Sequence, residues 1–148
     1  MGRTDWAEFR TAGHRAIVMT VRVAERLSKA ADRFLQPYKL SLAQFNLLVV
    51  LMADPRGLPQ ARIGQRLVVS RANVTGLVRR MIQRGLVRVE SDPGDARLKV
   101  VHLTPAGMRI VEQIEGPYFR EIDRLTRPLT AGRLKALGDL LDRLERSL

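Results

Sequence analysis

Residues 60–104 change from a helical to an extended pattern, and this change constrains the fold more than any other feature of the chain. A short helical segment, residues 60–67, leads after a tight bend into a longer one, residues 70–84. Ser70 is a suitable N-cap for the longer segment, and Gly85 is a suitable stop at its C-terminal end. Two helices joined in this way predict a helix-turn-helix.

The segment that follows is typical of a β-hairpin. Residues 86–90 and 98–103 are rich in β-branched side chains, and the Asp92-Pro93-Gly94-Asp95 sequence between them is typical of a turn. Thr104 then caps another helix that has Pro105 at its first position. The sequence therefore predicts a helix-turn-helix followed directly by a hairpin.

Helical segments precede this region. Apolar residues recur at helical spacing from about residue 6 to residue 35, and Pro37 ends that pattern. Ser41 caps a second helix that is apolar nearly all round, which predicts a buried element. Residues 54–59 are predicted to form a turn.

Two helices are predicted after the hairpin. The first runs from Thr104 to about Leu125, with a disturbance expected at Gly116-Pro117. The second is capped by Thr130 and carries one stripe of leucines. The leucines of this stripe are Leu134, Leu137, Leu140 or Leu141, Leu144 and Leu148.

Charge indicates a polyanionic partner. The chain has 26 Lys and Arg against 15 Asp and Glu, a net charge of +11, and four of the basic residues are lysine. Residues 54–104 hold ten basic and four acidic residues, so a third of the chain carries more than half of the surplus. A strongly basic domain attracts nucleic acid, although an arginine-rich proteome would also produce such a surplus.

Other classes of protein are not favoured. The chain has no cysteine and only two histidines, His14 and His102, so we expect no metal, no cofactor and no catalytic site. Aromatic residues make up 5% of the chain, and none lies between Phe45 and Tyr118, which argues against a stacking surface for single strands. Because the chain lacks a signal-peptide pattern and an apolar run of bilayer length, we expect a cytoplasmic protein that does not contact membranes.

The second helix of the predicted helix-turn-helix has two different faces. Val74, Leu77, Val78 and Met81 share the face that should pack against neighbouring helices. The opposite face is polar and basic around Gly76. It is interpreted as a DNA-binding face, and the alternative is a helix face that contacts only solvent. We predict base contacts from Arg71, Asn73, Thr75 and Arg79, phosphate contacts from Arg80 and Arg84, and a further contact at Ser70.

Three stretches of the chain resemble the MarR family of transcriptional regulators. The first is Tyr38-Lys39-Leu40-Ser41 with Gln44 and Leu48. The second is Val69-Ser70-Arg71-Ala72-Asn73-Val74-Thr75-Gly76-Leu77-Val78, continuing to Gly85-Leu86-Val87. The third is Asp92-Pro93-Gly94-Asp95-Ala96-Arg97, followed by Val101, Leu103-Thr104 and Gly107. One departure is Val89, which stands where the family often has a basic residue.

The resemblance implies a mainly α fold with a small β-hairpin wing, a winged helix-turn-helix with N- and C-terminal dimerisation helices. We expect a single domain over residues 1–148, with a DNA-binding lobe at 38–104 and dimerisation helices at 5–36 and 105–148. The resemblance also implies a homodimer on a pseudo-palindromic operator.

In the wing, the resemblance implies that Arg97 enters the minor groove and that Asp95 orients its guanidinium. The alternative is a surface ion pair that stabilises the turn. A non-specific architectural protein that binds duplex DNA is the alternative for the whole chain.

Similar regulators are often repressors that bind small anionic or aromatic effectors. Trp6, His14, Arg15 and Tyr38 are candidates to line such a pocket. The alternative for each of the four is a packed aromatic or a solvated polar side chain.

Overall fold

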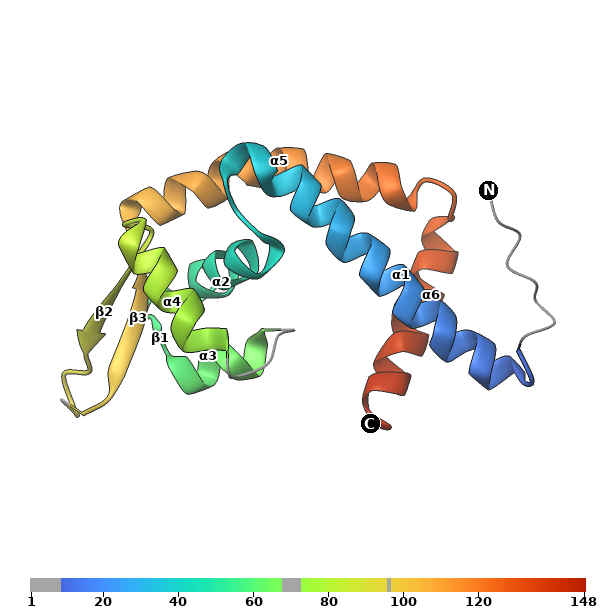
Figure 1. The fold of residues 1–148 in the computed structure, drawn as a ribbon, viewed down its shortest axis with the longest axis horizontal. Coiled ribbons are helices and arrows are strands. Elements are labelled where there is room, and N and C mark those ends of the chain that lie inside the picture. Colours follow the sequence, from blue (N-terminus) through green and yellow to red (C-terminus); the bar gives the residue numbers. More distant parts are fainter. Residues whose placement is uncertain (1–8, 68–72, 96) are drawn as a thin grey trace. The chain divides into compact units, whose positions relative to one another are not determined.

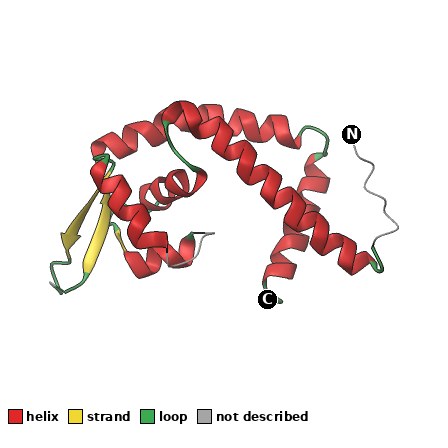
Figure 2. Ribbon diagram, viewed as in Figure 1, coloured by secondary structure: helices red, strands yellow, loops and turns green. Residues whose placement is uncertain are grey.

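The computed structural model describes residues 9–67, 73–95 and 97–148 of a mainly helical chain with a small sheet, as the sequence predicts (Figures 1 and 2). The chain divides into two compact units, Met1–Met108 and Arg109–Leu148, and the division falls within α5. In chain order the elements are α1 (Ala12–Leu35), the 3-10 turn η2 (Gln36–Tyr38), α2 (Leu42–Met52), β1 (Leu58–Pro59), α3 (Gln60–Arg66), α4 (Val74–Gln83), β2 (Val87–Ser91), β3 (Lys99–Leu103), α5 (Pro105–Thr126) and α6 (Ala131–Glu145).

The first helix, α1, begins later than predicted. The Thr11 hydroxyl accepts a hydrogen bond from the backbone N–H of His14 at 3.0 Å, which caps a helix that starts at Ala12. The predicted start, near residue 6, lies outside the described residues. As predicted, the helix ends before Pro37.

The second helix, α2, is buried along one side only. Ser41 and Gln44 form a capping box, which confirms the predicted start of this helix. The prediction that α2 is a buried element holds for one side of the helix, but 41% of Val49 and 38% of Met52 are exposed. The apolar residues of α2 therefore form two groups. One group faces the core, and the other contacts solvent in the single chain. The core-facing residues are Phe45, Leu47, Leu48 and Leu51.

The sheet is antiparallel, with strand order β1-β3-β2. Strands β2 and β3 pair from Val87 opposite Leu103 to Ser91 opposite Lys99, which confirms the predicted hairpin. Residues 58–59 were predicted as part of a turn, and this is wrong because Leu58 pairs with Val101 to form the short strand β1. Pro59 is tolerated there because β1 is an edge strand, where a missing N–H costs little.

The end of α4 follows the predicted pattern. Gly85 has a φ of +68°, its N–H donates to the Ile82 carbonyl at 2.8 Å, and the N–H of Leu86 donates to the Met81 carbonyl at 3.0 Å. This pair of bonds after a left-handed glycine is a Schellman motif, which ends the helix. The predicted start of the helix at Ser70 lies outside the described residues.

The helix α5 begins as predicted at Thr104, whose hydroxyl accepts the N–H of Gly107 at 3.1 Å. At Gly116-Pro117, where a disturbance is predicted, α5 is not interrupted and continues to Thr126. A proline ring clashes with the Cβ of the residue before it in a helix, and Gly116 has no Cβ.

The last helix, α6, is capped by Thr130 as predicted, with the Thr130 hydroxyl accepting the N–H of Arg133 at 3.4 Å. None of its residues is buried, so its leucines meet solvent in the single chain. Within the described ranges, none of the helices combines the length and apolarity needed to cross a membrane.

Candidate nucleic-acid interface

Helix α4 has one apolar and one polar face, as the sequence predicts. Four residues, Val74, Leu77, Val78 and Met81, are at most 3% exposed and pack into the core of the first unit. The exposed residues outside this apolar face are Asn73, Thr75, Arg79, Arg80, Ile82 and Gln83. The core therefore holds α4 by one face and leaves a polar, basic face open.

Gly76, the third residue of α4, has no packing reason to be glycine. A Cβ at this position would meet the Arg80 guanidinium at 3.5 Å, an ordinary van der Waals distance. Glycine within a helix costs about 1 kcal/mol relative to alanine, so Gly76 weakens the helix and gains no packing within the described chain. A close approach of another molecule to the backbone of α4 would account for it.

A side-chain hydrogen bond joins the two helices of the helix-turn-helix. The Thr75 hydroxyl donates to Gln60 Oε1 at 2.9 Å, and Gln60 is the first residue of α3. Ile63, which lies on the same helix as Gln60, is buried and packs α3 against the core. Thr75 is therefore held in position, and its oxygen keeps acceptor capacity for a further partner.

The tip of the β2–β3 hairpin is built by two aspartates. The Asp92 carboxylate accepts the N–H groups of Gly94 and Asp95 at 2.8 and 3.2 Å. The Asp95 carboxylate accepts the backbone N–H of Arg97 at 2.9 Å, and the Asp95 carbonyl accepts the N–H of Leu98 at 2.9 Å. In the part of the hairpin that is described, no ion pair joins the side chains of Asp95 and Arg97, so Asp95 holds the Arg97 backbone and leaves its guanidinium exposed.

The middle of the hairpin carries a charged cluster on one face. Glu90 pairs with Arg88 and with His102, whose Nε2 lies 3.6 Å from Glu90 Oε2. His102 also packs against Gly57, where a Cβ would come within 2.6 Å of the imidazole ring. This tight packing gives His102 a structural role in the sheet. The sequence pattern did not signal the contact with Gly57, because the two residues lie far apart in the chain.

Two predicted contacts, Ser70 and Arg71, lie outside the described residues. Arg84, predicted to contact phosphate, donates to two backbone carbonyls, those of Lys39 at 2.6 Å and Tyr38 at 3.4 Å. In Figure 1 the N-terminal end of α4 and the tip of the hairpin both lie toward the bottom of the view. The first unit therefore presents the exposed face of α4 and the exposed Arg97 on elements held by the same core.

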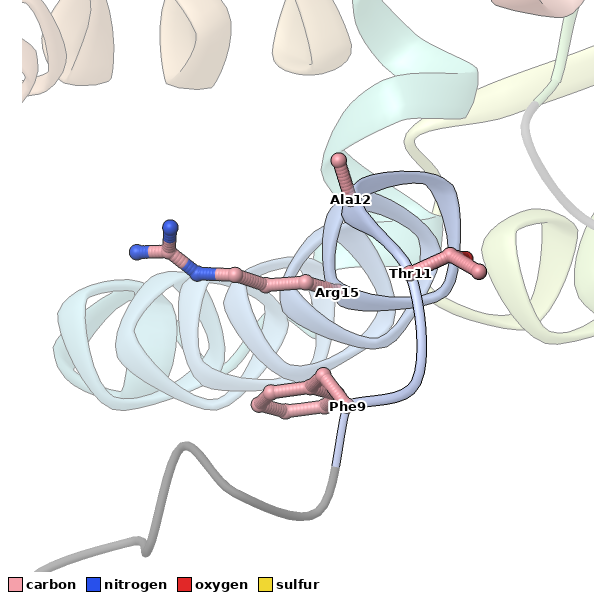
Figure 3. Close-up of a pocket in the computed structure, with 4 residues that line it drawn as sticks. All are labelled: Phe9, Thr11, Ala12 and Arg15. Carbon is pink, nitrogen blue, oxygen red and sulfur yellow. The ribbon is translucent and has the colours of Figure 1, made fainter.

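Of the predicted effector residues that the structure describes, Tyr38 lies far from His14 and Arg15. Trp6 lies outside the described residues, and His14 packs edge-on against Phe9, with ring centroids 5.5 Å apart. Arg15 lines an open hollow of about 440 Å³ with Phe9, Thr11 and Ala12 (Figure 3). Tyr38 lies past the opposite end of α1 against Phe34, roughly 30 Å away at 1.5 Å per helical residue.

The helices α3 and α4 are followed by a hairpin with an exposed arginine at its tip, and α4 has one buried and one open face. This arrangement is that of a winged helix-turn-helix DNA-binding protein of the transcriptional regulator class. The sequence model described as "MarR family" matches residues 38–98. The chain belongs to the MarR family.

Individual relatives support this assignment over most of the chain. The HTH-type transcriptional repressor NicR of Pseudomonas putida strain KT2440 is 31% identical over 134 residues, covering 85% of this chain and 84% of NicR. A MarR mutant from E. coli, solved in complex with operator DNA, is 26% identical with a TM-score of 0.78, covering 88% and 91% of the two chains. The PcaV regulator of Streptomyces coelicolor, solved with its natural ligand, is 27% identical with a TM-score of 0.72, covering 99% and 98%.

Proposed function

We propose that this regulator binds a specific double-stranded DNA sequence through α4 and the β2–β3 hairpin. The observation that carries the proposal is the open face of α4, where polar and basic side chains surround a glycine that the described packing does not require. A recognition helix reads base edges when it enters the major groove, and a glycine allows its backbone to come close.

The side chains of α4 divide into two roles. We assign base contacts to Asn73 and Thr75, which lie at the N-terminal end of α4, the part that enters the groove in this motif, and to Arg79 on the exposed face of the helix. Arg71, outside the described residues, keeps the base contact that the sequence predicts. Arg80 is assigned to phosphate, which positions the protein without reading sequence. Ser70 joins the contact set as the predicted cap of the same helix.

The wing supplies a second contact. We assign Arg97 to the minor groove, whose negative potential favours a guanidinium. Asp95 supports this role by accepting the backbone N–H of Arg97, which fixes where the arginine leaves the turn. The family resemblance and the exposed guanidinium both favour this assignment.

The chain is proposed to act as a homodimer. Apolar side chains on α1 are exposed in the single chain, and so are the leucines of α6. Burying apolar surface contributes about 25 cal/mol per Å², so a second copy of the chain is a favourable partner for these faces. The exposed apolar residues include Ile17, Val21 and Leu27 of α1 and Leu137, Leu140 and Leu141 of α6. A twofold dimer would present two α4 helices to half-sites of a pseudo-palindrome.

Repression with release by a small molecule is the proposed mode of action, in the cytoplasm. The relative NicR is a repressor, and the similar PcaV binds a ligand. An anionic or aromatic effector is the proposed ligand, with Trp6, His14, Arg15 and Tyr38 as candidate contacts. Because His14 and Tyr38 lie near opposite ends of α1, one chain cannot enclose a small ligand with both. Such a ligand releases DNA only if it binds the DNA-free conformation more tightly.

Selection from a random pool of duplex DNA at about 150 mM salt tests the proposal, since weak non-specific binding falls steeply with salt. We expect one enriched palindrome with half-sites about ten base pairs apart. Retained DNA without an enriched sequence would overturn the proposal and favour the architectural alternative. No retained DNA would contradict both.

A further inference from the structure

The C-terminal end of α4 is held from two sides. On one side, Arg84 Nη1 donates to the Lys39 carbonyl at 2.6 Å and Arg84 Nη2 donates to the Tyr38 carbonyl at 3.4 Å. On the other side, the Thr104 hydroxyl donates to the Gly85 carbonyl at 2.7 Å. The segment 84–86 therefore links the end of α1 with the start of α5.

The acceptors of Arg84 lie where a helix leaves carbonyls without partners. After α1, the η2 turn closes with the Lys39 N–H on the Gln36 carbonyl at 2.9 Å, and Lys39 adopts a left-handed φ of 55°. The last carbonyls of a helix have no intrahelical donors, and basic side chains commonly satisfy them. The planar guanidinium of Arg84 presents several N–H groups in one fork and reaches two neighbouring carbonyls at once.

Arg80, one turn earlier on α4, differs from Arg84 in this respect. Both arginines are exposed, but the side chain of Arg80 forms no hydrogen bond or ion pair with any residue that the structure describes. The guanidinium of Arg80 is therefore available for a phosphate, whereas two N–H groups of Arg84 are already used within the protein. The two arginines form a matched pair for experiment.

We propose that Arg84 is a positioning residue that fixes the end of α4 against the segment following α1, in place of the phosphate contact that the sequence predicts for it. The inference rests on the proposed role of α4 in DNA binding. Because the η2 turn joins the segment 38–39 directly to the end of α1, a displacement of that end is transmitted through Arg84 to α4. Arg84 thus couples the orientation of the recognition helix to the position of α1.

Salt dependence separates the two roles. The affinity of wild-type protein, Arg84→Ala, Arg84→Lys and Arg80→Ala is measured across a salt series on the duplex enriched by the wild type. Each lost phosphate contact lowers the slope of log K against log salt by about 0.9, so a dimer that loses two contacts changes it by about 1.8. We expect that slope change for Arg80→Ala only, whereas Arg84→Ala weakens binding about tenfold with the wild-type slope (about 1.4 kcal/mol).

The variant Arg84→Lys shows whether DNA binding depends on the positive charge of Arg84 or on the planar geometry of its guanidinium. An ammonium keeps the charge for a phosphate but not the planar fork for two carbonyls, so we expect this variant to bind as weakly as Arg84→Ala. Wild-type affinity for both Arg84 variants, or a slope reduced as in Arg80→Ala, would overturn the proposal. If Arg84→Ala does not fold, Arg84→Lys carries the same test.

The two hydrogen bonds from Arg84 to the carbonyls of Lys39 and Tyr38 form a clamp on the end of α4. Amide hydrogen exchange of the DNA-free protein tests this clamp independently of DNA binding. We expect Arg84→Lys to accelerate exchange in residues 36–42 and 81–86, and Arg80→Ala to leave both segments unchanged. Unchanged exchange in Arg84→Lys would overturn the clamp even if the enriched duplex binds normally. Faster exchange without any enriched duplex would uphold the clamp and refute the proposed function alone.

Discussion

Gly107 packs directly against the backbone carbonyl of Leu86: a Cβ on Gly107 would lie 2.2 Å from that oxygen. The same carbonyl accepts the N–H of Thr104 at 3.1 Å, so the first turn of α5 meets the end of α4 backbone to backbone. Only a residue without a Cβ allows this approach. The glycine that follows Leu103-Thr104 in the wing pattern therefore has a packing role.

Gly107→Ala should destabilise the protein by about 1–3 kcal/mol, the usual cost of overpacking a filled site. Urea unfolding measures the change. Gly138→Ala in α6 is the control, because a Cβ there meets no described atom within 4 Å and alanine should stabilise the helix by about 1 kcal/mol. A Gly107→Ala protein as stable as the wild type would contradict the packing role.

Gly76→Ala should move stability and DNA affinity in opposite directions. Alanine should stabilise α4 by about 1 kcal/mol, because the nearest described atom is 3.5 Å from the new Cβ. The same methyl group should weaken binding to the enriched duplex by keeping the backbone of α4 away from the groove. Thermal unfolding and fluorescence anisotropy measure the two effects, and unchanged or tighter DNA binding would refute the close approach.

Asp95→Asn and Asp95→Ala distinguish the two ways in which Asp95 could act on Arg97. Asparagine keeps a side-chain oxygen that accepts the N–H of Arg97, whereas alanine does not. If Asp95 holds the backbone, Asp95→Asn should bind the enriched duplex at least as tightly as the wild type, and Asp95→Ala should bind it more weakly. Equal losses in the two variants would instead indicate that the carboxylate charge orients the guanidinium.

Charged substitutions on α6 should dissociate the proposed dimer without unfolding the chain. Leu137 and Leu141 are 45% and 41% exposed in the single chain, so replacing both with glutamate removes apolar surface that a partner would cover. We expect sedimentation to show a dimeric wild type and a helical, monomeric double variant. Lys135→Glu, which alters only an exposed ion pair with Asp139, should remain dimeric. A well-folded dimer of the double variant would contradict this interface.

Local signals predicted most of the fold. Ser41, Gly85, Thr104 and Thr130 begin or end their helices through bonds to residues at most five positions away, so the chain itself specifies these boundaries. The two faces of α4 followed from helical periodicity, and burial confirms them.

Features that depend on distant partners were missed. The strand β1 exists because Leu58 pairs with Val101, and two residues carry too little pattern to predict a strand. The clamp of Arg84 depends on carbonyls 45 and 46 residues away, which no residue type reveals, since every residue has a carbonyl. The exposure of Val49 and Met52 on α2 was not predicted, because apolar composition alone does not distinguish one buried face from a fully buried helix.

The most direct test of base reading by α4 is to repeat the duplex selection with Arg79→Ala and Arg80→Ala beside the wild type. Arg79→Ala should lose preference at one symmetric pair of positions while the rest of the palindrome persists, because a lost base contact relaxes specificity locally. Arg80→Ala should enrich the wild-type palindrome with lower yield, because a phosphate contact carries no sequence information. An unchanged motif with Arg79→Ala would contradict the claim that α4 reads the operator through Arg79.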